Sequence, residues 1–135
     1  MPPKNSTDKP GVEERLIASI GLIDAEQACA LLRIETEDPE GAMQVMARGN
    51  AIITLVQNGK TMAPLFQFDM ASGRIFDVIG TILKDRPARI SNLRLCYWLT
   101  RSNMDFGDPP AQRFGHDDDA IIAAFLRYIE PERHG

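Results

Sequence analysis

The sequence predicts a mainly α-helical protein with one small β-hairpin. Two observations lead to this prediction. Apolar residues recur at helical spacing through most of the chain, and the pair Asn58–Gly59 separates two runs rich in β-forming residues. A chain of 135 residues with 44% hydrophobic content is long enough to bury a core without disulfides or a metal. Residues 1–11 lack apolar periodicity and combine Pro, Lys, Ser and Gly, which predicts a disordered arm.

Three short helices are expected in the first half, at 12–20, at 25–32 and from Pro39 to the pair Gly49–Asn50. The first has apolar residues at helical spacing and stops at a glycine. Asp24 precedes the second, with a glutamine three residues later, which is the arrangement of a capping box. Proline and a carboxylate open the third, where a first helical turn favours both, and Gly49 or Asn50 ends it in a left-handed conformation.

The two β-rich runs, 52–56 and 61–66, flank Asn58–Gly59, the pair most typical of a tight hairpin turn. Pro64 limits pairing in the second run and suits an edge strand. A hairpin after three short helices predicts a reduced, degenerate winged helix-turn-helix over residues 12–69, whose third helix would lie in the major groove of DNA.

Three residues of this region are candidates for DNA binding: Gln44, Arg48 and Lys60. Gln44 supplies an amide that can read a base edge, and the two cations are placed for phosphate contacts. Acidic residues at the start of the same helix would repel phosphate, and the net charge of −4 opposes an electrostatic grip by the whole protein. The sequence leaves DNA binding open.

The second half, residues 70–135, is predicted to be a compact helical bundle. Five apolar residues between Ile75 and Leu83 form a wide stripe on one helix. Ser91 can cap the next helix, and a polar loop follows at about 102–110. Three consecutive aspartates, Asp117–Asp119, open the last helix, where the helix dipole favours negative charge, and a proline ends it.

No motif in the sequence supports catalysis, a cofactor or a metal. Phosphate-binding glycine loops and serine-nucleophile elbows are missing, and only two histidines are present. Cys29 and Cys96 sit in apolar helical patterns without a partner at zinc-ligand spacing, so we expect buried thiols. His116 beside the three aspartates does not match a calcium loop, and helix capping explains these aspartates better. We therefore expect a protein that is not an enzyme.

The sequence contains no apolar run near the roughly 20 residues that span a bilayer. Its N-terminus also lacks the apolar stretch of a secretion signal. We expect a cytoplasmic protein without a membrane partner.

From Phe66 to Gly135 the sequence resembles the Xre/MbcA/ParS-type toxin-binding domain of bacterial antitoxins. The resemblance rests on an ordered set of features: an apolar helix before Pro87, then Trp98–Leu99, Asn103, Phe106–Gly107, Pro109 or Pro110, Phe114, and a terminal helix leading to a glycine. Leu22 to Asp69 also looks like the degenerate helix-turn-helix and "FQFD" junction that precede this domain in some members. The chain departs from the family pattern at Asp108, where a glycine is usual, and at Ser102, where a proline is usual.

The resemblance implies the antitoxin of a type II toxin–antitoxin pair, which binds a RES-domain toxin that consumes NAD and covers its active-site entrance. It also implies a homodimer, and repression of its own operon if residues 12–69 bind operator DNA. By position, the toxin-binding residues would be Arg127, Tyr128, Glu130, Arg133, His134 and Gly135. A polar tail beyond a capped helix can enter a polar pocket, although a frayed terminus is the plainer alternative. A stand-alone DNA-binding regulator and a protein–protein adaptor without a toxin remain alternatives.

Overall fold

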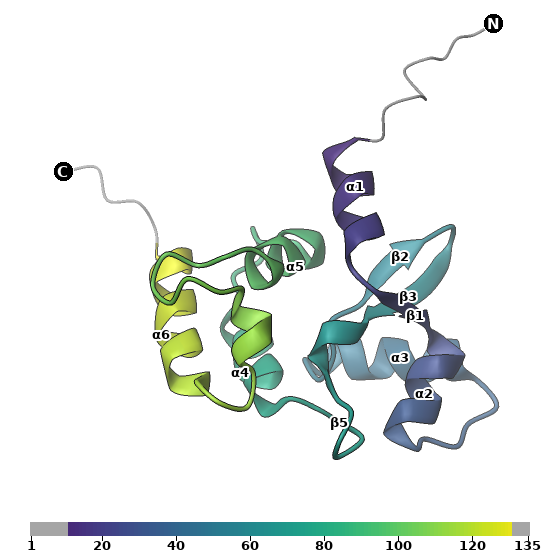
Figure 1. Cartoon of the computed structure of the whole chain (residues 1–135). Helices are drawn as coiled ribbons and strands as arrows, with labels where there is room; N and C mark the ends of the chain where they lie inside the picture. The colour runs from purple at the N-terminus through teal and green to yellow at the C-terminus, as the bar shows by residue number, and fades with distance from the viewer. Residues whose placement is uncertain (1–10, 131–135) are drawn as a thin grey trace, which may run out of the picture.

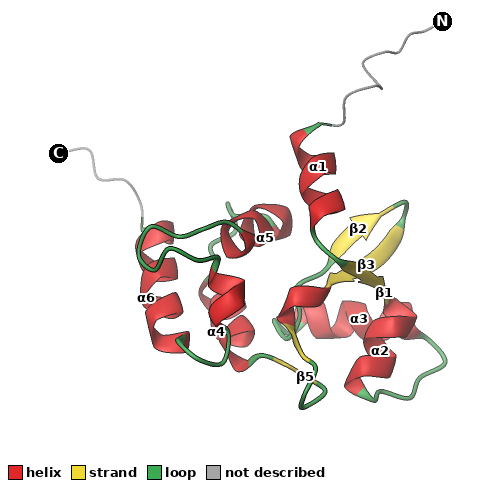
Figure 2. Ribbon diagram, viewed as in Figure 1, coloured by secondary structure: helices red, strands yellow, loops and turns green. Residues whose placement is uncertain are grey.

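The computed structural model describes residues 11–130, which form six α-helices and a small antiparallel sheet (Figure 2). The predicted arm, apart from Gly11, and the candidate residues Arg133, His134 and Gly135 lie outside the described residues. The fold is therefore mixed, with a helical majority, as the sequence predicted in its coarse form. Figure 1 shows helices α4, α5 and α6 on one side of the molecule and the sheet with α2 and α3 on the other.

The first half alternates helices and strands. The three strands form one antiparallel sheet in the order β1-β3-β2, so the strand nearest the N-terminus pairs with the second arm of the hairpin. Strand β1 was not predicted, because three residues without alternation give no strand signal in the sequence. Since β1 pairs with β3, the strand that ends at Pro64 is the middle strand of the sheet, and its expected edge position was wrong. The elements are α1 (Val12–Ser19), β1 (Leu22–Asp24), α2 (Ala25–Leu32), α3 (Pro39–Arg48), β2 (Leu55–Gln57) and β3 (Lys60–Pro64).

Local hydrogen bonds confirm the predicted helix ends. The Asp24 carboxylate accepts from the Gln27 backbone N–H at 2.8 Å, and the Gln27 side chain accepts from the Asp24 N–H at 3.0 Å, which completes the capping box of α2. Asp38 caps α3 by accepting from the N–H of Gly41 at 3.0 Å. Asn50, at φ 58°, is the left-handed residue after α3.

The hairpin is confirmed at Asn58–Gly59, whose φ angles of 54° and 77° are those of a type I′ turn. Its strands are shorter than predicted. The first begins at Leu55, because the backbone of Ile53 bonds to the buried Gln67 side chain. The second ends at Pro64, where the chain turns into a 3₁₀ helix, η2 (Leu65–Gln67), and so does not reach residue 66 as a strand.

The second half begins with a two-stranded ladder that the sequence did not predict. Ile75 lies in this ladder opposite Phe68, so its assignment to the following helix was wrong. Phe76 is extended, at φ −57° and ψ 135°, and separates the strand from the helix. The elements are β4 (Phe68–Asp69), β5 (Arg74–Ile75), α4 (Asp77–Asp85), α5 (Asn92–Thr100), the 3₁₀ helix η3 (Pro110–Arg113) and α6 (Asp118–Ile129).

Two hydrophobic clusters hold the fold together. The first unites α4, α5 and α6 with Ile20, Ile53 and Leu55 from the first half, and the second joins α2, α3 and β3 to Phe68. Phe66 packs against the first cluster, while Phe68 is buried in the second. The "FQFD" segment therefore places one aromatic ring in or against each cluster, which fixes the two halves to each other.

Candidate functional site

Positive charge is concentrated around α5. Between Asp85 and Asp105 the sequence has four arginines and no Asp or Glu, although the whole chain carries a formal net charge of −4. Three of these arginines are exposed: Arg89 before α5, Arg94 on α5 and Arg101 at its C-terminal end. This local excess of positive charge can attract an acidic group.

A hollow of about 430 Å³ lies between α5, α6 and the loop that follows α5, and we call it the α5–α6 hollow. Trp98 and Tyr128 stack in it with ring centroids 5.4 Å apart and planes 23° apart. The Arg94 Nε donates to the Tyr128 hydroxyl at 3.2 Å, and this bond raises the pKa of Arg94. Tyr97, Arg101, Ser102 and Asn103 complete the wall.

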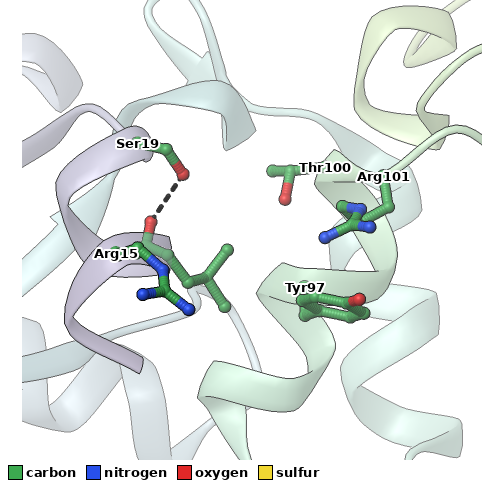
Figure 3. A pocket seen from close by; sticks show the side chains of 6 residues that line it. Arg15, Ser19, Tyr97, Thr100 and Arg101 are labelled. Atoms are coloured by element: carbon green, nitrogen blue, oxygen red, sulfur yellow. Dashed lines mark hydrogen bonds between the residues drawn. The ribbon is translucent and has the colours of Figure 1, made fainter. Parts of the chain in front are cut away.

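A second depression of about 450 Å³, the α1–α5 groove, lies on the other side of α5 (Figure 3). Arg15, Leu16 and Ser19 line it from α1, and Tyr97, Thr100 and Arg101 line it from α5 and its end. Tyr97 is 40% exposed, and the Arg101 guanidinium carbon lies 4.5 Å from the centre of its ring. This Tyr97–Arg101 pair separates the groove from the α5–α6 hollow.

The loop beside the hollow is fixed by Arg113. Its guanidinium bonds to Asp117 at 2.7 Å, to Asp108 at 3.1 Å and to the carbonyl of Phe106 at 3.1 Å. The bond to Asp117 is the main reason that the pKa of Arg113 is raised. Through Arg113, the loop is attached at Phe106 and Asp108 to Asp117 at the start of α6.

The structure brings some of the predicted toxin-binding residues to this surface. Tyr128 is inside the α5–α6 hollow, whereas Arg127 is exposed and pairs with Asp105 of the loop. Glu130 is exposed just after α6. Sequence analysis did not identify Tyr97 and Arg101. They are four residues apart, at α5 and its C-terminal end, and this spacing places two side chains on the same face of a helix.

The predicted DNA-binding residues are all exposed but do not form one cluster. Gln44 and Arg48 lie on α3, and Lys60 begins the second arm of the hairpin. The N–H of Thr61 donates to the Glu40 carboxylate at 2.8 Å, so the hairpin turn lies beside the first turn of α3. Arg48 is at the far end of α3, about 12 Å away along the helix axis. Lys60 on β3 therefore lies beside the start of α3, whereas Arg48 lies at the other end of that helix.

The two cysteines are buried free thiols, as predicted. Burial raises the pKa of Cys96 to about 12 and also raises the pKa of Cys29. Neither thiol is therefore activated as a nucleophile at neutral pH.

The aspartates around the start of α6 serve local structure. Asp117 pairs with Arg113, and Asp118 accepts from the N–H of Gly115 at 2.7 Å. Asp118 and Asp119 lie in the first turn of α6, as predicted, although the Asp117 side chain does not cap the helix. In the part of the chain that the structure describes, no group of three or more His, Cys, Asp or Glu could hold a metal ion.

None of the helices within residues 11–130 is both long and apolar enough to cross a membrane.

Comparison with known proteins found no matching family model, no matching curated protein and no matching solved structure.

Proposed function

We propose that this chain is an antitoxin that binds a RES-domain toxin through the α5–α6 hollow and the end of α6, covers the toxin's active-site entrance and performs no chemistry itself. One observation carries the proposal. Tyr128, a residue that the family resemblance assigns to toxin binding, lies in a hollow with Trp98 and Arg94. Tryptophan, tyrosine and arginine are the residue types most enriched among those that dominate binding energy in protein interfaces.

The arrangement of the family-like residues supports the same proposal. Trp98 and Asn103 line the hollow. Phe106 lies in the loop that Arg113 ties down, and the Arg113 guanidinium carbon is 5.2 Å from the centre of its ring. Residues that are scattered in the sequence thus build or support one surface. We expect the residues that carry the family resemblance to gather on one surface if they bind the same class of partner as in that family.

Co-expression with a cognate RES-domain toxin tests the proposal. We expect the chain to restore growth and to co-purify with the toxin. Tyr128→Ala should weaken the complex by about thirtyfold, the loss typical of a residue that dominates an interface. Asp119→Ala, exposed in the first turn of the same helix and outside the hollow, is the matched control. Lack of any complex, or equal affinity of the two variants, would overturn the proposal.

We also propose self-association, which the family resemblance implies. Two exposed apolar side chains could be buried in such an interface: Met104 is fully exposed and Leu126 is 46% exposed. Sedimentation analysis over a range of protein concentrations measures this property directly, and a monomer at all concentrations would contradict it.

A DNA-binding regulator is the second candidate function. We infer that residues 12–69 form a reduced winged helix-turn-helix. Their order of helix, strand, two helices and hairpin, with sheet order β1-β3-β2, favours this inference. The exposed Glu35 and Glu37 between α2 and α3 weigh against tight phosphate binding.

A gel-shift assay with the DNA upstream of the chain's own gene, at low salt, tests DNA binding. Arg48→Ala and Lys60→Ala should each weaken binding and reduce its salt dependence. Absence of any shift at low salt would remove this function.

A further inference from the structure

We infer that two copies of this chain associate through the free edge of strand β2, with Val56 of each copy paired antiparallel to Val56 of the other. The inference rests on the self-association proposed above and names the surface that forms the contact. Strand β2 lies at one side of the sheet, because the strand order is β1-β3-β2 (Figure 2). Its outer side is therefore open to a further strand, and addition of a strand to a sheet edge is a common mode of protein association.

The hairpin register directs the Val56 backbone groups toward this free edge. Gln57 and Lys60 flank the two-residue turn and form the hydrogen-bonded pair next to it. Hydrogen-bonded and non-bonded pairs alternate in an antiparallel ladder, so the next pair, Val56 and Thr61, is not hydrogen-bonded. Thr61 agrees with this alternation, because its N–H donates to the Glu40 carboxylate at 2.8 Å and not to β2. The N–H and carbonyl of Val56 point to the opposite side, where no strand of the described residues lies.

The edge lacks most of the features that prevent strands from pairing. Natural edge strands commonly carry a charge, a proline or a bulge. Residues 49–59 contain no charged side chain and no proline, and the register of β2 with β3 is continuous. Val56, in the middle of the strand, is 72% exposed, and a second strand would cover it. Because β2 has three residues, the interface is small, and we expect weak, reversible association.

A second copy fits this edge better than a charged segment of another protein. In an antiparallel pair centred on Val56, the two β-branched valines lie directly opposite each other, which favours a cross-strand contact. Leu55 then faces Gln57 of the other copy, and just beyond them Thr54 faces Asn58, so no like charges meet. A charged segment would find no opposite charge along β2. The same surface is used on both copies, as in the two-fold dimers that are commonest among homo-oligomers.

Paired charge substitutions test the inference in the full chain. Val56→Lys and Val56→Glu should each weaken self-association by about tenfold, because like charges would lie directly opposite each other. An equimolar mixture of the two variants should associate at least as well as the parent chain, since opposite charges then meet. Sedimentation equilibrium measures both effects. Val45→Lys and Val45→Glu are the matched controls, because Val45 is 59% exposed on α3, outside the sheet, and both should associate like the parent.

Hydrogen exchange followed by NMR supplies a second measurement. The N–H of Val56 should exchange more slowly as protein concentration rises, because it donates to the carbonyl of Val56 in the other copy. Exchange that does not depend on concentration, a mixture that associates no better than its two components, or equal losses in the Val45 and Val56 variants would overturn the inference.

Leu126→Lys separates this inference from self-association as such. If Leu126→Lys abolishes association and Val56→Lys does not, the copies meet through the second half of the chain, and only the contact at β2 is refuted. A parent chain that stays monomeric at all concentrations would refute both. Neither result bears on toxin binding, which is measured separately by co-purification.

Discussion

Replacing Gln67 with leucine should destabilise the whole protein. This side chain is fully buried and makes three hydrogen bonds to backbone groups. Its Oε1 accepts from the N–H of Ile53 at 2.7 Å, and its Nε2 donates to the carbonyls of Ile53 at 2.9 Å and Pro64 at 3.0 Å. The Gln67 side chain thus satisfies both backbone groups of Ile53, just before β2, as a neighbouring strand would.

The magnitude follows from the groups left behind. Leucine fits a similar volume but leaves buried backbone groups without this partner, at a cost of about 1–3 kcal/mol for each unsatisfied group. Additional apolar burial offsets part of this loss, so we expect a net decrease of about 3 kcal/mol in the free energy of unfolding. That is a large fraction of the roughly 5–15 kcal/mol typical of a small domain.

Urea unfolding measures this change, with circular dichroism for the whole fold and fluorescence of Trp98, the single tryptophan, for the α5–α6 region. Gln112→Leu is the matched control, because Gln112 is exposed on η3. Gln67→Glu adds a second test. A carboxylate facing two carbonyls has a raised pKa when folded, so this variant should lose stability as pH rises from about 4 to 7. A Gln67→Leu chain within about 0.5 kcal/mol of the parent would refute this reasoning.

Three further predictions concern other parts of the fold. Gly115→Ala should lower stability by about 1–2 kcal/mol in thermal unfolding, because φ is +82° and the new Cβ would lie 3.2 Å from Phe76, and an unchanged midpoint would contradict this. Arg113→Ala should speed hydrogen exchange of amides in the loop at 103–108, measured by mass spectrometry, whereas unchanged exchange would show that the loop holds itself. Cys96, with its pKa raised to about 12, should resist alkylation at pH 8 until urea unfolds the chain, and rapid labelling of the native protein would disprove its burial.

Local chemistry made several parts of the fold predictable. A helix cap or a tight turn depends on residues within four positions of one another, so Asp24 and Asn58–Gly59 could be interpreted directly from the sequence. Ser91 likewise caps α5 as predicted, by accepting from the Arg94 N–H at 3.1 Å. The family resemblance also rests on local motifs, and one of the residues that it assigns to toxin binding, Tyr128, lies in the candidate site.

Long-range pairing was not predictable in the same way. Ile75 fits an apolar helical stripe, but its position opposite Phe68 draws it into a strand. Strand β1 exists because β3 lies beside it, and the pairing of Leu22 with Pro64 joins residues far apart in the chain. In each case a partner distant in sequence outweighs local preference, because backbone groups must find hydrogen bonds in the folded chain.

The sequence by itself determined the ends of α2 and α3, the hairpin turn, the burial of both cysteines and the concentration of arginines between Asp85 and Asp105. Only the tertiary structure decided that Tyr97 and Arg101 stand between two depressions, and that Arg48 and Lys60 are at opposite ends of α3. The reason is physical. Caps, turns and periodicity act over one or two turns of chain, whereas a surface is made where separate elements pack together, and packing is set by the whole core.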